Sequence, residues 1–345
     1  MSRWRIVTAG VSATLLVGVL AGCTSSDADD AAPVPASMQE AVQTAERVLQ
    51  VTDVHAETGS TLLEGPTFGP DGQLYVVDVT APAGEPKVMR IDLESDEVET
   101  VYTDDSSAFT SAQFSPFDER LYLTDIAGGT IMSITADGDD PRIFFTGDVD
   151  GQRLSPDDIA FDEDGDLFVS DFTAFPGVPA EEAASSGRVV RIDGGTGEAS
   201  VVASGLASPN GISFTADWSG LWVSQYAANR IDLITLDEER TGVASVHPSM
   251  YVSAGAAQID SSAVDADGNV YQAFEGKPQI DVHSPDGDLL ATIRVPEGHE
   301  GLSSATNLAV RPGTTEAYMT VSGEAGGFVY AFQSLSEGAR QSNGG

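Results

Sequence analysis

A short hydrophobic segment with a central aromatic residue occurs six times along this chain at nearly regular intervals. Its first copy is GQLYVVD at residues 72–78, and similar segments follow about every 46–54 residues. An internal repeat of this length indicates that the chain is built from copies of one supersecondary unit. The six central aromatic residues are Tyr75, Tyr122, Phe168, Trp222, Tyr271 and Tyr318.

Each copy belongs to a longer pattern of four alternating segments separated by polar turns. In the first repeat, an inner segment and a Pro-Asp-Gly turn precede the aromatic segment, and KVMRIDL and EVETVY follow it. Four short antiparallel strands in about 40–50 residues are typical of a β-propeller blade. The sequence therefore predicts an all-β chain that forms a six-bladed β-propeller over residues 38–335. The blades are expected near residues 64–103, 111–147, 157–204, 210–247, 260–296 and 306–333.

The sixth repeat contains only three strands before a polar tail at residues 336–345. A propeller ring closes when a distant strand completes the last blade, so that no sheet edge remains unpaired. We expect residues 46–52, ERVLQVT, to supply that strand. Because apolar residues at the start of residues 38–50 have helical spacing, we also expect a short helix passing into the closing strand.

The N-terminal residues predict export and lipid attachment. Residues 1–22 have the layout of a secretory signal, and their apolar stretch is too short to span a membrane. The end of this segment, Leu20–Cys23, resembles a bacterial lipobox, in which Cys23 becomes the first mature residue and carries lipid. Residues 23–37 are small and acidic and predict a flexible tether. We expect an extracytoplasmic protein, lipid-anchored to the bacterial cell membrane, with an unlipidated Cys23 as the alternative.

Net charge excludes several classes of partner. The chain has 16 basic and 54 acidic residues, a formal net charge of −38, and no cluster of Lys or Arg. Such a protein is repelled by nucleic acid, which we do not expect as a partner. Cys23 is the single cysteine, which rules out an intrachain disulfide and a cysteine-rich metal site. We favour a monomer, although the sequence leaves the oligomeric state open.

Polar residues recur at one position of the inner strands. This position lies eleven residues before the aromatic residue in five repeats, and twelve before it in the fourth, whose turn is one residue longer. Inner strands line the central channel of a propeller, so residues in one register form a ring. The register predicts that six side chains converge at one mouth of the channel: Glu64, Ser111, Asp157, Asn210, Asp260 and Asn307.

Three carboxylates in such a ring suggest a bound cation. At close range they repel one another and raise one another's pKa values unless a cation compensates their charge. A set of oxygen ligands suits a hard cation, first Ca²⁺ and then Mg²⁺ or Mn²⁺, with Zn²⁺ as a further alternative. Polar residues before strands also cap turns or bind channel water, and this interpretation stays open, above all for Ser111 and Asn307.

Several segments resemble one protein family. The sequences EGPTFGPDGQLYVVD, SPDDIAFDEDGDLFVSDF, SPNGISF and IDSSAVDADGNVYQAF are similar to the senescence marker protein (regucalcin) and gluconolactonase family. Within it, they look most like the bacterial drug-responsive lactonases. The resemblance covers roughly residues 60–333. It implies a six-bladed propeller that holds Ca²⁺ in its channel and hydrolyses small lactones.

The resemblance also implies roles for individual residues. Glu64 and Asn210 match metal ligands of the family, and Asp260 matches the aspartate that touches the metal and handles the proton. Asp157 and Ser261 match the lactonase branch, and we include both among the expected metal ligands.

Two positions test how far the resemblance extends. Ser155 stands where regucalcin-like members carry a sugar-binding arginine, which argues against a gluconolactone-like substrate. The lactonase branch holds a second calcium beside its third blade, and the acidic residues 146–152 are a candidate for that site.

These residues predict metal-assisted hydrolysis of a lactone or another ester. A cation held by the ring would polarise the substrate carbonyl and stabilise the oxyanion. Asp260, or Asp157 across from it, would take a proton from the attacking water and return it to the leaving alkoxide. The expected partner is a small lactone or ester. The alternative is a lipid-anchored propeller that binds a partner and uses the metal only structurally.

Other motifs are interpreted as structural. DEDGD at 162–166 and DADGN at 265–269 resemble calcium loops, but they occupy hairpin turns that require Asp-Gly. Asp78, Asp125 and Asp171 are expected to bond to loop amides. No G-x-S-x-G elbow is present, and the four histidines are expected at the surface.

One long connection is placed at the same mouth as the polar ring. Residues 172–187 join the second and third strands of the third blade. Phe172, Phe175 and Val178 are candidates to cover a substrate, with a plain surface loop as the alternative.

Overall fold

β-strands account for nearly all of the regular structure. The computed structural model describes residues 41–342, and the only helices among them are single turns or little more. The prediction of an all-β chain is therefore confirmed. The helices are α1 (Ala180–Ala183), η1 (Tyr226–Ala228) and η2 (Arg340–Ser342).

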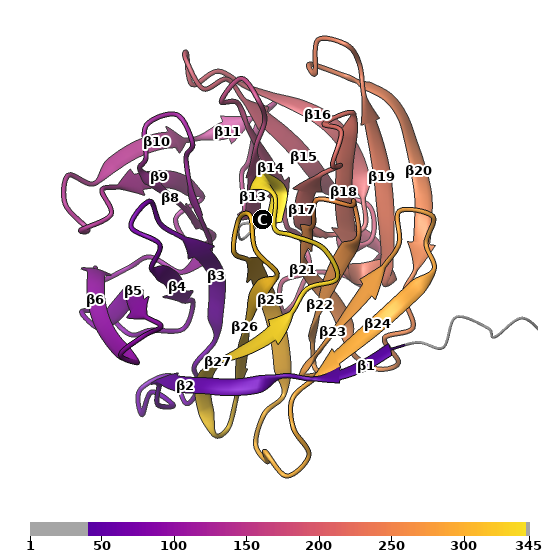
Figure 1. The fold of residues 1–345 in the computed structure, drawn as a ribbon. Helices are drawn as coiled ribbons and strands as arrows, with labels where there is room; N and C mark the ends of the chain where they lie inside the picture. The colour runs from indigo at the N-terminus through magenta and orange to yellow at the C-terminus, as the bar shows by residue number, and fades with distance from the viewer. Residues whose placement is uncertain (1–40, 343–345) are drawn as a thin grey trace, which may run out of the picture. The chain divides into compact units, whose positions relative to one another are not determined.

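Four sheets contain four antiparallel strands each, paired in chain order (Figure 1). The first sheet contains β3 (Leu63–Phe68), β4 (Leu74–Asp78), β5 (Pro86–Asp92) and β6 (Glu97–Thr103). The second contains β7 (Phe109–Phe114), β8 (Leu121–Asp125), β9 (Thr130–Ile134) and β10 (Arg142–Thr146). The third sheet contains β13 (Pro156–Phe161), β14 (Leu167–Asp171), β15 (Gly187–Ile192) and β16 (Ala199–Leu206). The fourth contains β17 (Pro209–Phe214), β18 (Gly220–Gln225), β19 (Arg230–Leu236) and β20 (Val243–Tyr251). A small hairpin, β11 (Asp148–Val149) and β12 (Gln152–Arg153), lies between the second and third sheets in the chain.

The remaining strands form a nine-stranded sheet that consists of two groups. The groups are joined through one pair of residues, Phe274 and Ala305. The first group is β21 (Gln258–Val264), β22 (Val270–Glu275), β23 (Gln279–His283) and β24 (Leu289–Arg294), with β1 (Ala41–Thr44) on its edge. The second is β25 (Ser304–Val310), β26 (Glu316–Gly323) and β27 (Gly326–Gln333), completed by β2 (Glu46–Thr52).

The N-terminal strands partly contradict the sequence prediction. The helix expected at the start of residues 38–50 is wrong for the described part, because residues 41–44 form β1 and pair in parallel with β24. Ala45, which is buried, continues this contact by donating from its N–H to the carbonyl of Arg294 at 2.8 Å. The unpaired edge of β24 offers backbone partners that outweigh local helix propensity. β2 has the bounds expected for the additional strand and pairs antiparallel with β27.

The first strands of the successive groups pack against one another. β3 contacts β7, and the contacts continue through β13, β17, β21 and β25, which in turn contacts β3. Figure 1 shows these inner strands around the middle of the view, with the later strands of each group farther out. The arrangement of four-stranded antiparallel sheets is consistent with a propeller.

The repeated aromatic residues pack between neighbouring sheets. Four of the six meet a phenylalanine at the end of a neighbouring inner strand, edge to face. Such contacts stabilise a pair of rings beyond the area they bury. With ring centroids 4.9–5.8 Å apart, the pairs are Tyr75–Phe114, Tyr122–Phe161, Phe168–Phe214 and Tyr318–Phe68.

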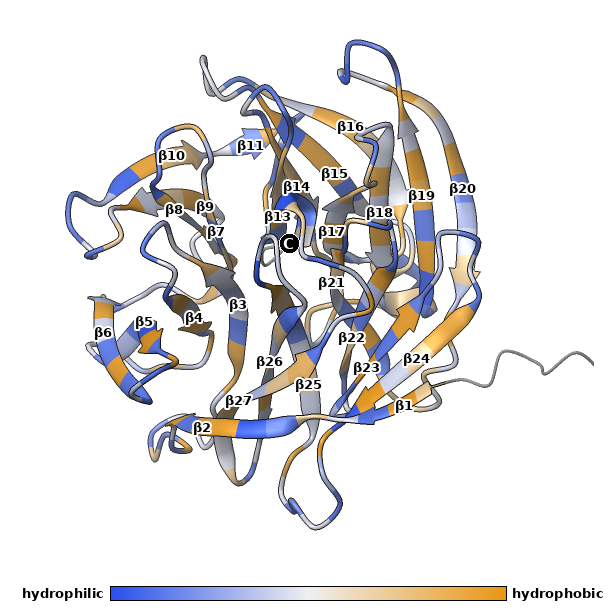
Figure 2. Cartoon of the chain, viewed as in Figure 1, coloured by the Kyte–Doolittle hydropathy of each residue, from blue (hydrophilic) through white to orange (hydrophobic). Residues whose placement is uncertain are grey.

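Burial decreases from the inner strands to the outer ones. All residues of β4 are buried, whereas most of β6 is exposed or half-buried. Figure 2 shows the corresponding mixture of hydrophilic and hydrophobic residues along outer strands such as β6 and β20. Strands that are covered on both faces consist mostly of hydrophobic residues. Strands with one face in water alternate between hydrophobic and polar residues.

The segment after β27 packs onto the sheets. The sequence predicts a polar tail from residue 336, and in the structure Gly338 of this segment forms β-bridges with Asp265 and Pro312. Leu335 donates from its N–H to the hydroxyl of Tyr271 at 2.7 Å. Figure 1 shows the C-terminal end among the inner strands. Up to residue 342, this segment is therefore part of the folded unit.

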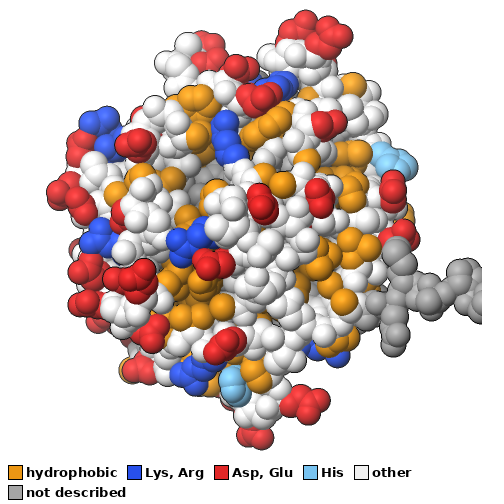
Figure 3. Space-filling model, in the orientation of Figure 1, with side chains coloured by type: hydrophobic (Ala, Val, Ile, Leu, Met, Phe, Trp, Pro, Cys, Tyr) orange, Lys and Arg blue, Asp and Glu red, His pale blue; other side chains and the backbone are white. Residues whose placement is uncertain are grey.

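The predicted signal peptide, Cys23 and the tether fall at residues 1–37 and lie outside the described residues. No helix between residues 41 and 342 has the length and apolar content needed to cross a membrane. Acidic side chains are spread over the face drawn in Figure 3, among fewer basic ones.

Candidate functional site

The pairing of each inner strand with the second strand of its sheet is interrupted in the first half of the inner strand. In β13, Asp157 and Asp158 together oppose Ser170 on β14, because the register shifts between Pro156 and Ile159. Two residues opposite one form a β-bulge, which changes the direction of side chains and is common beside active sites. Shifts occur at corresponding places in β3, β7, β17, β21 and β25.

Four of the predicted site residues occupy one position relative to these bulges. Each directly follows the inner-strand residue that pairs with the third residue after the repeated aromatic residue, as Asp157 follows Pro156, the partner of Asp171. Because the inner strands pack side by side, equivalent positions lie at the same level. The four residues are Glu64, Asp157, Asn210 and Asp260.

The other two predicted members, Ser111 and Asn307, are one residue out of register. Their strands place Thr110 and Thr306 at the equivalent position instead. The turns of the second and sixth repeats are one residue longer than that of the first, as is the turn of the fourth. The pairs that close these turns show the difference: Phe68–Leu74, against Phe114–Leu121, Phe214–Leu221 and Val310–Ala317. A fixed count of eleven residues therefore failed twice.

Both threonines support the carboxylates next to them. The Thr306 hydroxyl lowers the pKa of the Glu64 carboxyl, and the Thr110 hydroxyl lowers that of Asp157. Thr110 Oγ1 also donates to the Asp157 carbonyl at 3.0 Å. The sequence count missed these residues, and only the pairing register identifies them.

Burial and mutual repulsion dominate the electrostatics of the cluster. Glu64, Asp157 and Asp260 are each at most 7% exposed. Burial raises the pKa of all three well above the ordinary range; the charge of Asp260 adds to this for Glu64, and that of Asp157 does so for Asp260. A hydrogen bond from the Asn210 side chain to Asp260 acts in the opposite direction. The charges of the three carboxyl groups therefore act on one another, and the Asn210 side chain acts on Asp260.

Several oxygen atoms of the cluster have no partner in the protein. Glu64 Oε2 and Asn210 Oδ1 are buried without a hydrogen bond. Buried oxygens of this kind need a proton, water or a cation, and an all-oxygen donor set suits Ca²⁺. Within residues 41–342, however, no three Asp, Glu, His or Cys side chains are gathered into a group that could hold a metal. The residues thus fit a hard cation by their chemistry.

A second layer, one residue further along the inner strands, surrounds Asp158. This residue is 1% exposed, and neither carboxylate oxygen makes a hydrogen bond of good geometry. Burial raises the pKa of Asp158 to about 7, although the hydroxyls of Ser261 and Ser111 oppose the shift. Ser261, predicted as a metal ligand, therefore interacts with Asp158 in this layer.

Glycines allow the strands to approach each other at this layer. A Cβ atom on Gly211 would lie 2.6 Å from the Ser262 nitrogen, and one on Gly65 would lie 2.5 Å from the Ala112 nitrogen. Real Cβ atoms do not come so close, so both positions need glycine. This accounts for the glycine that follows Glu64 and Asn210 in the sequence.

Two further residues belong to the site and were missed by the sequence analysis. The charge of Glu275, at the end of β22, raises the pKa of Asp157 and of Asp260. The Tyr226 hydroxyl donates a hydrogen bond to Glu275. Burial and then Glu275 raise the Tyr226 pKa, with smaller contributions from Asp260 and Asp157. Tyr226 therefore lies beside the carboxylates. No repeated spacing marks either residue.

The long connection after β14 reaches the same place. The Phe172 ring packs edge-on against Tyr226 and Phe175, with centroids 5.2 and 5.3 Å apart. Its backbone is anchored by Ser208, whose Oγ accepts from the N–H of Thr173 at 2.9 Å. The Ser208 carbonyl accepts from the N–H of Tyr226 at 3.1 Å. These bonds attach the aromatic residues to the strand that carries Asn210.

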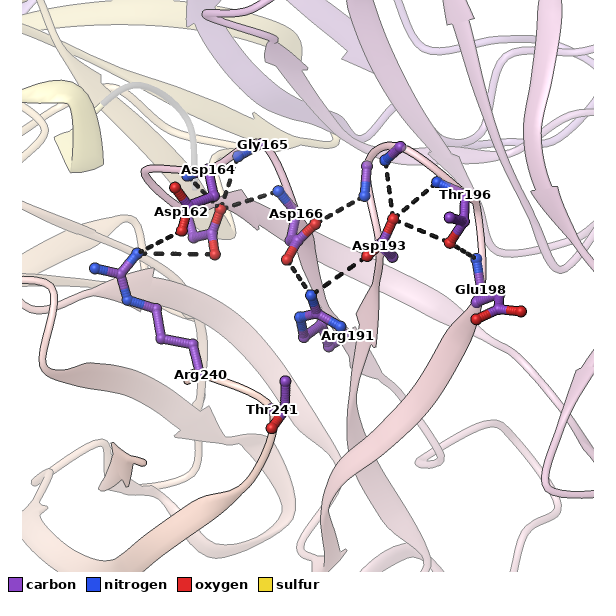
Figure 4. Close-up of polar contacts among 12 residues, drawn as sticks. Asp162, Asp164, Gly165, Asp166, Arg191, Asp193, Thr196, Glu198, Arg240 and Thr241 are labelled. Atoms are coloured by element: carbon purple, nitrogen blue, oxygen red, sulfur yellow. Dashed lines mark hydrogen bonds and ion pairs between the residues drawn. The ribbon is translucent and has the colours of Figure 1, made fainter. Parts of the chain in front are cut away.

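The calcium-like loops are turns, as predicted. Asp162 Oδ1 accepts from the N–H groups of Asp164, Gly165 and Asp166 at 2.8–2.9 Å, and Arg240 lies beside this turn (Figure 4). In the fifth repeat, Asp265 binds turn amides in the same way.

Other polar residues also have structural partners. Asp78, Asp125 and Asp171 accept from the N–H groups of nearby loops at 2.6–3.2 Å, as expected. The expectation that all histidines are at the surface is wrong for His283, which is buried in β23.

The segment considered for a second calcium contains β11 and β12. Asp148 and Asp150 are exposed there. The carbonyl of Val149 accepts from Arg188 Nη1 at 2.7 Å, and the same buried guanidinium pairs with Asp171. An arginine therefore already binds the inward side of this hairpin.

Solved structures share this fold at low sequence identity. Regucalcin, a calcium-binding protein from Agrobacterium tumefaciens, has a TM-score of 0.68 at 15% identity over 88% of this chain and 99% of its own. A gluconolactonase from Xanthomonas campestris has a TM-score of 0.64 at 19% identity, over 86% and 98%.

Sequence comparison extends the similarity to named relatives. The lactonase drp35 of Staphylococcus saprophyticus is 26% identical over 317 residues, covering 89% of this chain and 92% of that protein. The lactonase drp35 of Staphylococcus aureus strain USA300 is 25% identical over 302 residues, covering 85% and 86%. The model of the SMP-30/gluconolactonase/LRE-like region matches residues 62–323, most of the chain. With this match and the shared fold, the chain belongs to the SMP-30/gluconolactonase/LRE-like family.

Proposed function

We propose that this protein is a metal-dependent hydrolase that opens small lactones. The observation that carries the proposal is the cluster of Glu64, Asp157, Asn210 and Asp260, placed at one level by four inner strands and buried with unpaired oxygens. Its similarity to proteins named lactonase and gluconolactonase supports the same reaction.

The proposal includes a six-bladed propeller as the frame of the site. The circular order of contacts among β3, β7, β13, β17, β21 and β25 supports six blades. The pairing of β2 with β27 supports closure of the ring by the N-terminal strand. In this frame, the first halves of the inner strands face one mouth of the channel.

Glu64, Asp157, Asn210 and Asp260 would hold the cation, and Asn210 contributes an oxygen without adding negative charge. Ca²⁺ is the first candidate, with Mg²⁺, Mn²⁺ and Zn²⁺ as alternatives. A bound divalent cation supplies Lewis acidity that polarises a lactone carbonyl and stabilises its oxyanion. Ser261 and Asp158 lie one layer deeper and would support the ligands.

The proton transfers belong to Asp260. Its carboxylate would accept the proton of the attacking water and return it to the alkoxide that leaves when the lactone ring opens. A pKa raised by burial and neighbouring charge brings a carboxyl closer to the pH at which such a base is effective. Asp157 is the second candidate for this role, because it shares the level and the burial of Asp260.

Tyr226 and Phe172 would then contact the substrate from the side. Their edge-to-face contact places apolar surface next to the carboxylates, while the Tyr226 hydroxyl stays bonded to Glu275. Excluding water from such a site strengthens the electrostatic interactions within it.

We also propose that Cys23 anchors the mature protein to the outer face of the bacterial cell membrane by lipid. This proposal rests on the lipobox-like Leu20–Cys23 alone. Radiolabelled palmitate supplied to a lipidating host tests it: label is expected on the parent and absent from Cys23→Ser. An unlabelled parent would remove the anchor.

The enzyme proposal is tested by a hydrolysis screen over aliphatic, aromatic and sugar lactones. We expect turnover with added Ca²⁺, its loss with EDTA, and recovery when Ca²⁺ is restored. Turnover that resists chelation would rule out the metal-dependent mechanism. Calcium binding without hydrolysis of any lactone or ester would favour the alternative, a binding propeller with a structural metal.

A further inference from the structure

Glu275 lies at the outer border of the carboxylate cluster. It is the last residue of β22 and pairs with Gln258, which precedes Asp260 by two residues on β21. The rise of a strand therefore places the Glu275 backbone roughly 7 Å from the level of Asp260, on the side where the inner strands begin. Glu275 is exposed, whereas Asp260 is only 7% exposed. The cluster thus has a solvent-accessible carboxylate next to its buried ones.

Contacts on both sides hold Glu275 in this place. The Tyr226 hydroxyl donates a hydrogen bond to Glu275 Oε2, and the Tyr226 ring packs edge-on against Phe172. The backbone turns directly after Glu275 at Gly276, whose φ of +80° is a conformation that glycine adopts readily. The Gly276 N–H donates to Ser304 Oγ at 3.0 Å. The carboxylate is therefore fixed beside the two aromatic rings that we expect a substrate to contact.

The charge of Glu275 acts across the cluster. It raises the pKa of both Asp157 and Asp260, which lie on different inner strands. Lys277, two residues further along the chain, has its Nζ 4.9 Å from the centroid of the Phe274 ring. No Lys, Arg or His between residues 41 and 342 is among the groups that shift the pKa of Asp157. The effect of Glu275 on Asp157 is therefore not compensated by a neighbouring basic side chain.

A bound divalent cation would offset only part of the negative charge at this place. Its two positive charges are fewer than the three negative charges of Glu64, Asp157 and Asp260 when all three are ionised. The charge of Glu275 adds to this excess, and so does the formal net charge of −38 on the whole chain. A ligand with its own negative charge is repelled in such a field, whereas an uncharged ligand is not.

We propose that Glu275 selects uncharged ligands for this site. It disfavours lactones that carry an ionised acid group, and it weakens the binding of the hydroxy acid that forms when a lactone ring opens. That product is an anion at neutral pH, so the same charge that selects the substrate also speeds release of the product, a step that limits many enzymes. The inference rests on the proposed lactone hydrolysis and adds to it a substrate class and a specificity-determining residue.

Two phthalides of similar shape test the selection by turnover. The 5-carboxylate is an anion, and the 5-carboxamide is its uncharged counterpart. With the full chain and saturating Ca²⁺, Glu275→Gln should raise kcat/KM for the carboxylate relative to the carboxamide about three- to tenfold, as expected for one unit charge at this distance in a partly wet site. Glu275→Asp keeps the charge and should keep the parental ratio. The matched control Glu239→Gln, in an exposed turn at the other end of the fourth sheet, should also keep it.

A binding measurement separates this inference from the hydrolysis itself. 2-(Hydroxymethyl)benzoate is the product of phthalide hydrolysis, and 1,2-benzenedimethanol is an uncharged molecule of similar shape. We would titrate each into the Ca²⁺-loaded chain by calorimetry. Glu275→Gln should tighten binding of the benzoate about three- to tenfold and leave binding of the diol unchanged. In about 0.5 M NaCl, screening should reduce the difference between the parent and Glu275→Gln.

Each contrary result has a distinct meaning. Equal effects of Glu275→Gln on charged and uncharged ligands would overturn the charge selection and leave the hydrolysis proposal intact. Selective tightening of the benzoate without turnover of any lactone would support the selection and remove the proposed hydrolysis. The same gain in Glu275→Asp would assign the effect to packing around Tyr226 and overturn the role of the charge. If neither ligand binds to the parent or to Glu275→Gln, Glu275 borders no ligand site and the inference fails.

Discussion

The inner strands begin among carboxylates and end among phenylalanines. At their beginning, β-bulges interrupt the pairing, and Glu64, Asp157 and Asp260 are buried with raised pKa values. At their end, pairing is regular, and Phe114 and Phe214 pack edge to face against neighbouring sheets. The charged ends and the apolar ends of the same strands therefore have different roles. The regular, apolar ends hold the sheets together, so the bulged ends can carry charges that destabilise the fold.

The largest effect on activity is expected for Asp260→Asn, which tests the carboxylate end of the inner strands. The proposal predicts a 10²–10⁴-fold lower kcat on the best lactone, the usual contribution of a positioned acid or base. Folding should be unaffected, because asparagine keeps the size of the side chain and removes a buried charge. Steady-state kinetics and circular dichroism measure the two outcomes.

The matched control is Asp267→Asn, the same chemical change in the exposed turn at the other end of the same hairpin. Parental kcat is expected there. A parental kcat in Asp260→Asn would contradict the proposed role of Asp260 in proton transfer.

Phe214→Ala tests the phenylalanine end. Phe214 is 1% exposed and packs against Phe168, so its loss should lower the free energy of unfolding by about 3–5 kcal/mol. Activity per folded molecule should persist. Denaturant unfolding and activity of the folded fraction provide the measurement, with Phe117→Ala, at a 52% exposed ring, as the control. A stable but inactive Phe214→Ala would show that the two ends are not separate.

The stability of the fold should also depend on pH through the carboxylate end of the inner strands, where burial raises the pKa of Asp158. The pKa of Asp158 is raised to about 7 in the folded protein, above its ordinary value near 3.8. Its contribution to stability is therefore complete below about pH 4 and is lost as the pH rises towards 7. Glu64, Asp157 and Asp260 act in the same direction.

In EDTA, the Tm should fall as the pH rises from 5 to 7.5, and saturating Ca²⁺ should reduce that fall. Calorimetry in about 0.3 M NaCl screens the surface charges. Asp158→Asn should flatten the profile in EDTA because asparagine does not ionise. A Tm that is constant or rises with pH in the parent would contradict the burial of these charges.

The smallest effect is expected for Tyr226→Phe. The change removes the hydroxyl that bonds to Glu275 but keeps the ring that packs on Phe172. We expect a change in kcat/KM of less than about tenfold, in line with one hydrogen bond. Tyr251→Phe, at an exposed tyrosine, should change nothing. A loss of more than 100-fold would mean that Tyr226 takes part in the chemistry.

The repeat in the sequence predicted much of the fold because one contact recurs in it. Tyr75, Tyr122 and Phe168 return at similar spacing since each packs against a neighbouring inner strand. The helix expected before residue 46 failed because its alternative is not local. β1 forms by pairing with β24, about 250 residues away in the chain. The helix propensity of residues 41–44 contains no information about this distant strand edge.

The site was predictable where the turns have the assumed length. Asp157 and Asp260 were found by counting from an aromatic residue, whereas Thr110 and Thr306 were missed because one additional residue in a turn shifts the register. Glu275 has no repeated spacing at all. Its role follows only from its charge beside Asp157 and Asp260.

The all-β class, the repeated sheets, the acidic character and four residues of the cluster follow from the amino-acid sequence alone. These properties are local or periodic, and they can be read without knowing which segments meet. The register of Thr110 and Thr306, the pairing of β1 with β24 and the packing of Leu335 on Tyr271 became known only from the folded chain. Each of these depends on contacts between distant segments, whose partners are set by packing of the whole chain and not by neighbouring residues.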